Sequence, residues 1–317
     1  MKQVFRLSCA AIALVLILGA SHRAQAQPDP FVTQVSSSDR ESFVGGTSGN
    51  GRFVVVESNG DISTEKTAGR NNSDGNREIF LFDYAQRRIF QITNTTSTRV
   101  DTAKPDFATT SPQDRSNVII EVSNNRPVIS NNGRWIVFSS NASTPASFDG
   151  NNAANRAALA SDGNQELFLY FVPNPPAAVL ESGVDVPFFD LAGGEFTRLT
   201  NTPASRVPTA GTATVAPFVA DDNRDASVND NASVIAFVST RDLTGTNADA
   251  NPEVFIFKRN TVSPATGTFV QVTNTTGNTI FNENPSVSGI AGGSSNLAFI
   301  SNANIAIGGA SNNSDLN

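Results

Sequence analysis

The sequence predicts an all-β protein made of a repeated four-stranded unit. An apolar phrase recurs four times, and its first three copies are followed by a second apolar phrase that opens with glutamate. The first phrase begins at Arg52, Arg134, Ser233 and Ser295, and the second at Glu78, Glu166 and Glu253. Such self-similarity indicates supersecondary units that bury a core only against one another. Asn, Ser, Thr and Gly fill the intervals and only 16% of residues are charged, as in β proteins with many turns.

The first 26 residues have the pattern of an export signal. Cationic residues precede a short apolar run at 10–20, and a small-x-small cleavage site follows at 24–26. The run is short for a membrane-spanning helix, which needs about 20 apolar residues. We therefore expect a signal peptide over 1–26 and no membrane insertion after its cleavage, with a retained anchor as the alternative. The expected location is exported, either periplasmic or extracellular.

The chain that remains after cleavage, from Gln27 onward, is expected to lack cysteine and histidine. Cys9 is the only cysteine and His22 the only histidine, and both lie in the leader. This excludes a disulfide, a Ser-His-Asp triad, a Cys-His pair and a histidine-ligated zinc site. The leader also carries three cations and no acidic residue, so its removal changes the formal charge from −7 to −10. An acidic surface repels phosphate, which argues against nucleic-acid partners.

Each unit is expected to contain four short strands, named A to D in chain order. Strand A follows a proline or a small residue, as at 127–130 and 285–288, and a turn rich in Asn and Gly leads into strand B. Strands B and C are apolar on both faces, as expected of strands between neighbouring sheets. Strand D is assigned to the closing phrase Gln-Ile-Thr-Asn at 91–94 and its copies at 198–201 and 271–274, whose polar residues suit an outer edge.

The spacing between units is uneven, which indicates insertions in loops. The units have the approximate bounds 43–95, 126–201, 215–274 and, in part, 284–317. The candidate insertions are 100–124, 142–160, 172–186 and 203–224, the last with a domain linker as the alternative. We expect 172–186 to interrupt strand C, because Phe189 and Asp190 repeat the end of the first C phrase, Phe82 and Asp83.

The repeat resembles the TolB-like family of WD-type β-propeller repeats. In that family a Ser-x-Asp-Gly turn leads to Ile-Ala-Phe, then Glu-Ile-Phe-Val-Tyr-Asp, then Leu-Thr. The matching pieces are Ser-Asn-Asn-Gly at 130–133, Val-Ile-Ala-Phe at 234–237, Glu-Ile-Phe-Leu-Phe-Asp at 78–83 and Leu-Thr at 199–200. The resemblance covers about residues 43–317 and implies a β-propeller of four-stranded antiparallel blades. The chain departs from the family at the turn between strands A and B, where Asn replaces Asp, and we expect no separate amino-terminal or hydrolase domain.

By this resemblance the chain supplies about three and a half blades, fewer than the family's closed rings contain. We therefore expect an incomplete ring. An open fan leaves an apolar sheet face and strand edges uncovered at its ends. The chain is interpreted as a fragment, as a truncated product, or as a protein that completes its ring by self-association.

A polar pattern before strand C offers candidate metal ligands. Side-chain oxygens at alternate positions are typical of sites for a hard cation such as calcium. The candidates are Asp74, Asn76, Glu78, Asp162, Asn164, Glu166, Asp249, Asn251 and Glu253, and an incomplete fourth copy stands at 313–317. The alternative is an Asx-type turn that feeds the strand, with the glutamate on its exposed face.

Aromatic and basic residues in the phrases are expected to be structural. Trp135, Phe138, Phe168 and Tyr170 lie within B and C strands, so core packing is expected rather than a sugar-stacking platform. Arg52 and Arg134 occupy equivalent positions and are expected to cover apolar edges and pair locally, with an anion site as the alternative. No catalytic set of residues emerges.

The sequence thus predicts an exported, non-catalytic binding or scaffolding module that mediates protein–protein interaction. No cofactor is expected other than calcium at the polar turns. Partner contacts are expected on the loop insertions or on the exposed faces of the end blades. The alternatives are a calcium-stabilised cell-surface propeller and a glycan-active enzyme that uses paired carboxylates.

Overall fold

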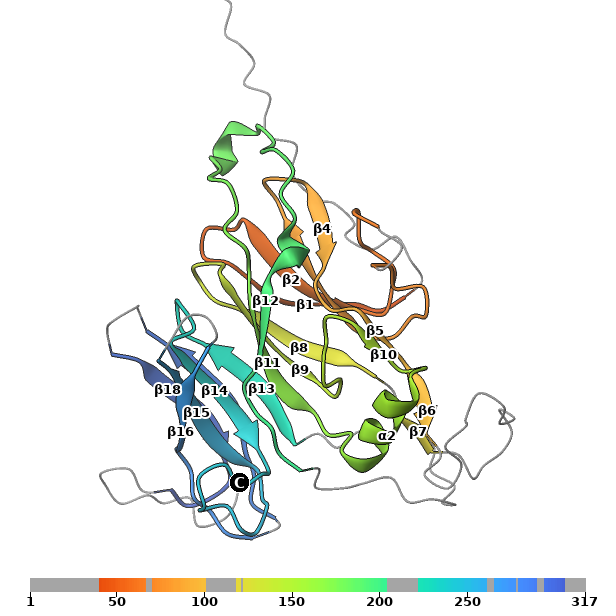
Figure 1. Cartoon of the computed structure of the whole chain (residues 1–317). Helices are drawn as coiled ribbons and strands as arrows, with labels where there is room; N and C mark the ends of the chain where they lie inside the picture. The colour runs from red at the N-terminus through yellow and green to blue at the C-terminus, as the bar shows by residue number, and fades with distance from the viewer. Residues whose placement is uncertain are drawn as a thin grey trace, which may run out of the picture.

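Three four-stranded antiparallel sheets and one two-stranded sheet follow one another along the described part of the chain (Figure 1). The computed structural model describes residues 40–66, 70–100, 118–120, 122–203, 222–260, 265–277, 279–289 and 294–305. Each of these sheets is one unit of the repeat, and we call them blades 1 to 4. The mostly-β, propeller-like arrangement of four-stranded antiparallel sheets confirms the predicted fold class.

The strands of each blade follow the order A to D. Blade 1 contains β1 (Ser42–Thr47), β2 (Phe53–Ser58), β3 (Glu78–Asp83) and β4 (Arg88–Gln91). Blade 2 contains β8 (Asn124–Ile129), β9 (Trp135–Ser140), β11 (Glu166–Phe171) and β12 (Glu195–Arg198). Blade 3 contains β13 (Asn223–Val228), β14 (Val234–Ser239), β15 (Glu253–Arg259) and β16 (Gly267–Gln271), and blade 4 contains β17 (Asn282–Ser288) and β18 (Asn296–Ser301).

Shorter elements lie in the connections between these strands. Strand β5 (Thr95–Thr96) pairs in parallel with β10 (Phe148–Asp149), and β6 (Thr98–Val100) pairs antiparallel with β7 (Val118–Ile120). The helical elements are α2 (Ala153–Ser161), capped by the side chain of Asn152, and the 3₁₀ turns η2 (Leu180–Ser182) and η3 (Leu191–Gly193). Over the described ranges, no helix combines the length and the apolar character that crossing a bilayer requires.

Apolar side chains from adjacent blades interleave to form the core. One cluster joins blades 1 and 2 around Phe138, Phe168 and Tyr170, and a second joins blades 2 and 3 around Trp135 and Phe237. All five side chains are at most 4% exposed, so the predicted core role of the aromatic residues in blade 2 is confirmed. The facing rings of strands B and C stack in both blades 2 and 3, with centroids 5.8 Å apart for Phe138 and Phe168.

The A strands lie side by side along one edge of the fan. Strand β1 contacts β8, β8 contacts β13, and β13 contacts β17. Backbone hydrogen bonds also join successive turns between strands A and B. The N–H of Gly49 donates to the carbonyl of Asn131 at 2.7 Å, and the N–H of Asn132 donates to the carbonyl of Asp230 at 2.9 Å. The blades are therefore held together at this end by main-chain contacts that do not depend on side-chain identity.

The predicted position of strand D is wrong. Strands β4, β12 and β16 end at Gln91, Arg198 and Gln271, which are the first residues of the three closing phrases. The Thr of each phrase lies beyond the strand and uses its side-chain hydroxyl instead. Thr93, for example, accepts a hydrogen bond from the N–H of Ile79 at 2.8 Å. The closing Gln-Ile-Thr-Asn phrase and its copies thus contact strand C through the threonine hydroxyl and do not form a β-strand over their full length.

The predicted interruption of strand C in blade 2 is also wrong. Strand β11 runs unbroken from Glu166 to Phe171, as long as β3 in blade 1. The inserted segment lies after the strand, between β11 and β12. By register, Phe171 of β11 corresponds to Asp83 of β3, so Asp190 is not its equivalent. Asp190 instead caps η3, where its side chain accepts the N–H of Ala192.

Several sequence predictions fall outside the described residues. These are the signal peptide over 1–26, most of the insertions at 100–124 and 203–224, and the incomplete polar pattern at 313–317.

The connection between β2 and β3 covers the outer side of blade 1. Ser63 and Thr64 bond to β4: the N–H of Thr64 donates to the carbonyl of Ile89 at 3.0 Å, and the Thr64 hydroxyl accepts the N–H of Ile89 at 2.9 Å. Ile62 packs on the face formed by Val56 and its neighbours in β3 and β4. The outward face of blade 1 is therefore partly covered by its own connection.

Replacing Gly45 by alanine is expected to destabilise the junction of blades 1 and 2. A Cβ atom at Gly45 would lie 2.0 Å from the carbonyl oxygen of Pro127 in β8, so one of the two strands must shift. Overpacking of this kind costs about 1–3 kcal/mol. The matched control is Gly46→Ala, whose Cβ would meet Ile129 no closer than 3.7 Å. Urea unfolding of the two variants measures the difference, and equal midpoints would contradict the packing described.

Candidate functional site

Each complete blade buries a glutamate at the first residue of its C strand. Glu78, Glu166 and Glu253 open β3, β11 and β15, and none of the three is more than 2% exposed. A carboxylate removed from water is costly unless hydrogen bonds compensate it. The surroundings of these three side chains are therefore the first candidate for a functional site.

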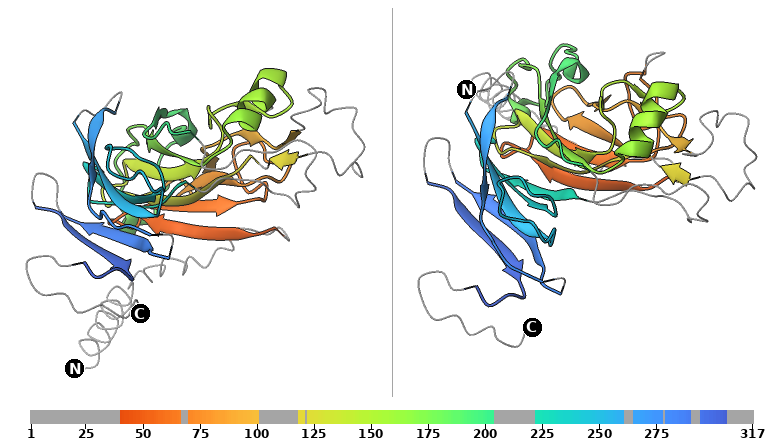
Figure 2. Two further views of the ribbon diagram at one scale, coloured as in Figure 1. Left: turned by 90° about the horizontal axis from the view of Figure 1, so that it is seen from below. Right: turned by 60° about the horizontal axis from the view of Figure 1, so that its bottom comes forward.

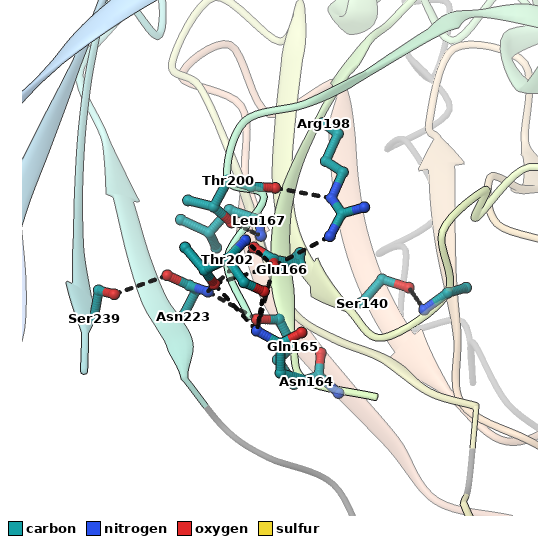
Figure 3. Close-up of polar contacts among 11 residues, drawn as sticks. Ser140, Asn164, Gln165, Glu166, Leu167, Arg198, Thr200, Thr202, Asn223 and Ser239 are labelled. Carbon is teal, nitrogen blue, oxygen red and sulfur yellow. Dashed lines mark hydrogen bonds and ion pairs between the residues drawn. The ribbon is translucent and has the colours of Figure 1, made fainter. Parts of the chain in front are cut away.

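The carboxylate of Glu166 receives hydrogen bonds from three directions (Figure 3). Its own blade supplies the N–H of Thr202 at 2.6 Å and the Thr202 hydroxyl at 3.1 Å, both to Oε1. The side chain of Asn164 donates to the same oxygen at 3.3 Å. Asn223, the first residue of β13 in blade 3, donates from Nδ2 to Oε2 at 3.2 Å. The guanidinium of Arg198 lies 3.1 Å from Oε1 and forms an ion pair.

The same arrangement recurs around Glu78. The N–H and hydroxyl of Thr95 donate to Oε1 at 2.5 and 2.7 Å, and Asn76 donates to it at 3.2 Å. The hydroxyl of Thr93 donates to Oε2. Asn124, the first residue of β8 in blade 2, donates from Nδ2 to Oε2 at 2.9 Å.

A third copy surrounds Glu253. Thr275 donates to Oε1 from its N–H and from its hydroxyl, both at 2.6 Å. Asn282, the first residue of β17 in blade 4, donates to Oε2 at 3.1 Å. We call each such arrangement a glutamate clamp: the buried glutamate, the two threonines and the asparagine of its own blade, and the asparagine that opens the A strand of the next blade.

The clamp asparagine joins two blades through one side chain. Besides the carboxylate, Asn223 bonds the carbonyl of Gln165 at 3.0 Å and the hydroxyl of Thr202 at 3.0 Å. Asn124 and Asn282 make the corresponding contacts with the residue before their glutamate and with the second threonine. Each clamp therefore ties the start of strand C and the end of strand D to the next A strand.

Blade 1 has no clamp asparagine at its own start. Strand register places Ser42 where the later blades have asparagine, since Ser42 faces Ser58 as Asn124 faces Ser140. The Ser42 and Ser58 hydroxyls bond one another at 2.8 Å. Among the described residues the first clamp is therefore that of Glu78, and each clamp joins one blade to the next along the chain.

Burial dominates the electrostatics of the clamps. It raises the pKa of the Glu78 carboxyl to about 7, and the hydrogen bonds from Thr93, Thr95 and Asn76 lower that pKa only in part. Burial also raises the pKa of Glu166, where hydrogen bonds and the charge of Arg198 oppose the shift. Blades 1 and 3 have Gln91 and Gln271 at the position of Arg198, so the described structure gives their glutamates no such cation.

The structure divides the predicted metal ligands into two groups. The asparagines and glutamates of the pattern, Asn76, Glu78, Asn164, Glu166, Asn251 and Glu253, are buried in the clamps. The prediction that the glutamate lies on an exposed face of the strand is therefore wrong. The glutamates can be buried because hydrogen-bond donors around each carboxylate replace the water that it loses.

The aspartates of the pattern lie apart from the glutamates, nearer the surface. Asp74 accepts the N–H of Ser97 at 3.3 Å, Asp249 accepts the N–H of Gly277 at 3.2 Å, and Asp162 ends α2. Within the described residues no three acidic side chains gather as a metal-binding group. Calcium binding at these turns stays a prediction.

Sequence reasoning missed the clamp asparagines and the second threonines. Asn124, Asn223 and Asn282 stand in segments that read as turns before strand A, and Thr95 stands in what reads as the end of strand D. A usable signal was present, because Thr-Asn-Thr recurs at 93–95, 200–202 and 273–275 in step with the buried glutamates.

A second candidate is the insertion at 172–190, which we call the strap. It leaves β11 in blade 2, reaches over the turn between β3 and β4 in blade 1, and returns to β12 (Figure 1). The Arg52 guanidinium donates to the carbonyl of Pro176 at 2.5 Å, and Arg87 pairs with Asp185 at 2.8 Å. The N–H of Phe189 donates to the side chain of Gln86 at 2.7 Å. The strap is thus fixed to a blade other than its own.

Arg52 and Arg134, which follow the turn between strands A and B in blades 1 and 2, both donate hydrogen bonds to the strap. Arg52 is buried, pairs with Asp83 through bonds of 2.9 and 3.0 Å, and lies over the ring of Phe53. Arg134 lies over the ring of Phe171, 4.7 Å from its centroid, and donates to Asn174. The predicted local pairing and covering of apolar edges by these arginines is confirmed.

No family model matches the chain, and no curated protein matches it. Among solved structures, the chain is similar to the crystal structure of the tricorn protease, with a TM-score of 0.30 and 14% identity over 71% of this chain and 18% of that one. It is also similar to the hydrazine synthase of Kuenenia stuttgartiensis, with a TM-score of 0.25 and 11% identity over 67% of this chain and 38% of that one. The chain thus spans well under half of either protein. At such low TM-scores the fold class rests on the observed sheets alone.

Replacing the clamp asparagine Asn124 by alanine is expected to lower the free energy of unfolding by about 1–3 kcal/mol, because Oε2 of buried Glu78 loses a donor. The control is Ser42→Ala, at the same register of blade 1, where the described residues include no clamp glutamate from an earlier blade. Ser42→Ala is expected to lower the free energy of unfolding by less than Asn124→Ala does. Urea unfolding, followed by Trp135 fluorescence, measures the free energy of unfolding of both variants. An equal decrease in the two variants would show that the clamp asparagine does not contribute more to stability than Ser42 does.

Stability is expected to fall as pH rises through neutrality. Glu78 has a pKa of about 7 in the folded protein against an ordinary value of 4.5. Because the folded pKa is the higher one, the stabilising contribution is complete below pH 4.5 and is lost as pH rises through 7. The full span corresponds to about 3 kcal/mol. Glu78→Gln removes the titrating group, so its unfolding free energy is expected to change less between pH 5 and 8.5. Parallel profiles for the two proteins would contradict this.

Proposed function

We propose that the protein is an exported, non-catalytic scaffold of the TolB-like propeller type that binds a protein partner. The main support for the proposal is that the buried carboxylates are hydrogen-bonded within the protein. Each glutamate that the sequence singles out is occupied by donors from two blades, and its partners are the groups that hold the fan together. This hydrogen bonding favours a structural role for the three glutamates over a catalytic one.

The location in the proposal comes from the leader. A cationic start, an apolar run and a small-x-small site together favour export. A chain that keeps neither cysteine nor histidine after cleavage depends on packing and hydrogen bonds for stability outside the cytoplasm. The clamps provide such hydrogen bonds at every junction between blades.

The strap supports a partner surface on blades 1 and 2. Val179 and Val184 are 68% and 72% exposed, although the strap itself is fixed to blade 1 at several points. Together with Tyr84 and Arg87 they line a hollow between the strap and the turn after β3. Exposed apolar groups on an anchored loop are typical of protein–protein contact surfaces, because little entropy is lost when a partner binds them.

A photo-crosslinking residue placed at Val184 tests the proposal in cells that export the chain. We expect one crosslinked adduct of defined mass in the exported fraction, and its loss when Val179→Asp is added. The control position is Val270 on β16, which is 40% exposed and distant in sequence from the strap. An absence of strap-specific adducts would contradict the proposal.

The glycan-active alternative requires a reaction that depends on the acidic groups. Turnover of a glycan panel that is lost in Glu166→Gln, while circular dichroism and the unfolding midpoint stay unchanged, would overturn the non-catalytic assignment. We expect no turnover, and we expect Glu166→Gln to lower stability instead, because its amide places a donor among donors.

A further inference from the structure

Asparagine is followed by glycine at three places in the sequence, 50–51, 59–60 and 132–133. In such a pair the peptide nitrogen of the glycine readily attacks the asparagine side chain, because glycine has no Cβ atom to hinder the approach. Two of the pairs lie in the turns between strands A and B of blades 1 and 2, and the third follows β2. The three pairs share this chemistry, and the structure gives them different surroundings.

Both turns between strands A and B hold the asparagine side chain in the same way. The Oδ1 atom of Asn50 accepts the Ser48 hydroxyl at 2.8 Å and the N–H of Arg52 at 3.1 Å. Asn132 has the equivalent donors at 2.7 and 3.0 Å. Negative charge develops on Oδ1 when a nucleophile attacks Cγ, and donors already in place stabilise that charge. For Asn59, no described residue donates a hydrogen bond to Oδ1.

The turn of blade 2 is packed on both sides. Gly133 is buried, and a Cβ atom built on it would lie 2.7 Å from the side chain of Phe53 in blade 1. The N–H of Asn132 donates to the carbonyl of Asp230 in blade 3 at 2.9 Å. Blade 2 lies between blades 1 and 3 in the fan (Figure 2), so both neighbours resist movement of its turn.

The turn of blade 1 leaves its glycine open. Asn50 and Gly51 are both exposed, and apart from the chain neighbours no described heavy atom lies within 4 Å of a Cβ atom built on Gly51. The N–H of Gly51 donates to the carbonyl of Ser48 at 2.9 Å, within the turn itself. Gly60, by contrast, is buried, and its N–H donates to the Ser58 hydroxyl at 2.9 Å. An exposed turn opens at a lower free-energy cost than a packed one, which favours reaction at Asn50.

We infer that Asn50 is a site of spontaneous deamidation and backbone isomerisation. The peptide nitrogen of Gly51 gives its proton to water and attacks Cγ of Asn50. The bond from Cγ to Nδ2 then breaks, ammonia leaves with a proton taken from water, and a succinimide ring remains. Water opens this ring at either carbonyl, which gives aspartate or isoaspartate. The modification needs no partner and goes beyond the proposed binding function.

The two products have different effects on the turn. Aspartate leaves the main chain unchanged, and its carboxylate still accepts the hydrogen bonds that Oδ1 of Asn50 accepts. Isoaspartate carries the side-chain methylene into the main chain and so lengthens the turn. The N–H of Gly49 in this turn donates to the carbonyl of Asn131 at 2.7 Å, which is a main-chain contact between blades 1 and 2. Isoaspartate is therefore expected to weaken the junction of these blades, and aspartate is not.

Peptide mapping by mass spectrometry tests the site. The purified protein is incubated at neutral pH, and deamidation is followed separately at Asn50, Asn59 and Asn132. In the folded protein, deamidation of Asn50 is expected to be at least about tenfold faster than that of either other asparagine. In urea, where all three segments are open, the three rates are expected to converge. Equal rates in the folded protein, or a faster reaction at Asn132, would overturn the inference. An unmodified Asn50 under conditions in which the unfolded chain reacts would also overturn it.

Two variants test the effect on the junction. Asn50→Asp supplies the aspartate product alone and is expected to unfold at the same urea concentration as the fresh protein. Aged protein that contains isoaspartate, detected by methyl transfer with an isoaspartyl methyltransferase, is expected to unfold at a lower concentration. Asn50→Gln closes a ring far more slowly, so ageing is expected to leave its midpoint unchanged. Equal loss of stability on ageing in Asn50→Gln and in the unaltered protein would contradict the assigned effect.

Discussion

A buried carboxylate at each blade junction is the constraint on which the rest of the structure depends. Its desolvation is costly, and the cost is offset only when donors from several segments converge on it. In the clamp of Glu166 those donors come from the turn before strand C, from the end of strand D and from Asn223 of the next blade. Each blade supplies several donors to its own glutamate, and the next blade adds one more through its clamp asparagine. The hydrogen bonding of the carboxylate is therefore complete only when the next blade is in place, which links the stability of a blade to the presence of its neighbour.

The clamps also explain how the fan tolerates long and unlike connections. The segment between strands B and C contains a helix in blade 2 and none in blades 1 and 3, within the described residues. The strap lengthens only the connection between strands C and D of blade 2. The connection that contains the helix also contacts the end of blade 1: the N–H of Asn94 donates to the carbonyl of Pro145 at 2.7 Å, and β10 pairs with β5 beside Thr95. The connections thus differ in length and structure between blades, while the clamp residues recur in each complete blade.

The first and the last described blades differ in their clamp residues and in how well their apolar side chains are covered. Blade 1 has Ser42 in place of the clamp asparagine and covers its outward face with its own connection. Blade 4 supplies Asn282 to Glu253, and its Ile300 is exposed.

Sequence patterns predicted the parts of the fold that depend on apolar burial. The B and C strands and the aromatic core at Phe138 and Phe168 follow from runs of large apolar residues, whose burial dominates folding. The clamps could not be predicted in this way, because Asn and Thr beside a strand have the composition of a turn. A glutamate at a strand start was expected to face water, since glutamate is rarely buried without a partner. One of its partners lies in the next blade, 46 residues away for Glu78 and Asn124, and the others lie in segments that have the composition of turns, so a local pattern does not bring them together.

A double-mutant cycle between Glu166 and Asn223 tests the central claim most directly. The unfolding free energies of Glu166→Gln, Asn223→Ala and the double variant are compared with that of the unaltered protein. If the glutamate clamp couples blades 2 and 3, the two losses are strongly non-additive, with a coupling of about 1 kcal/mol or more. If the losses add to within about 0.5 kcal/mol, the two side chains act independently and the clamp is not what holds the blades together.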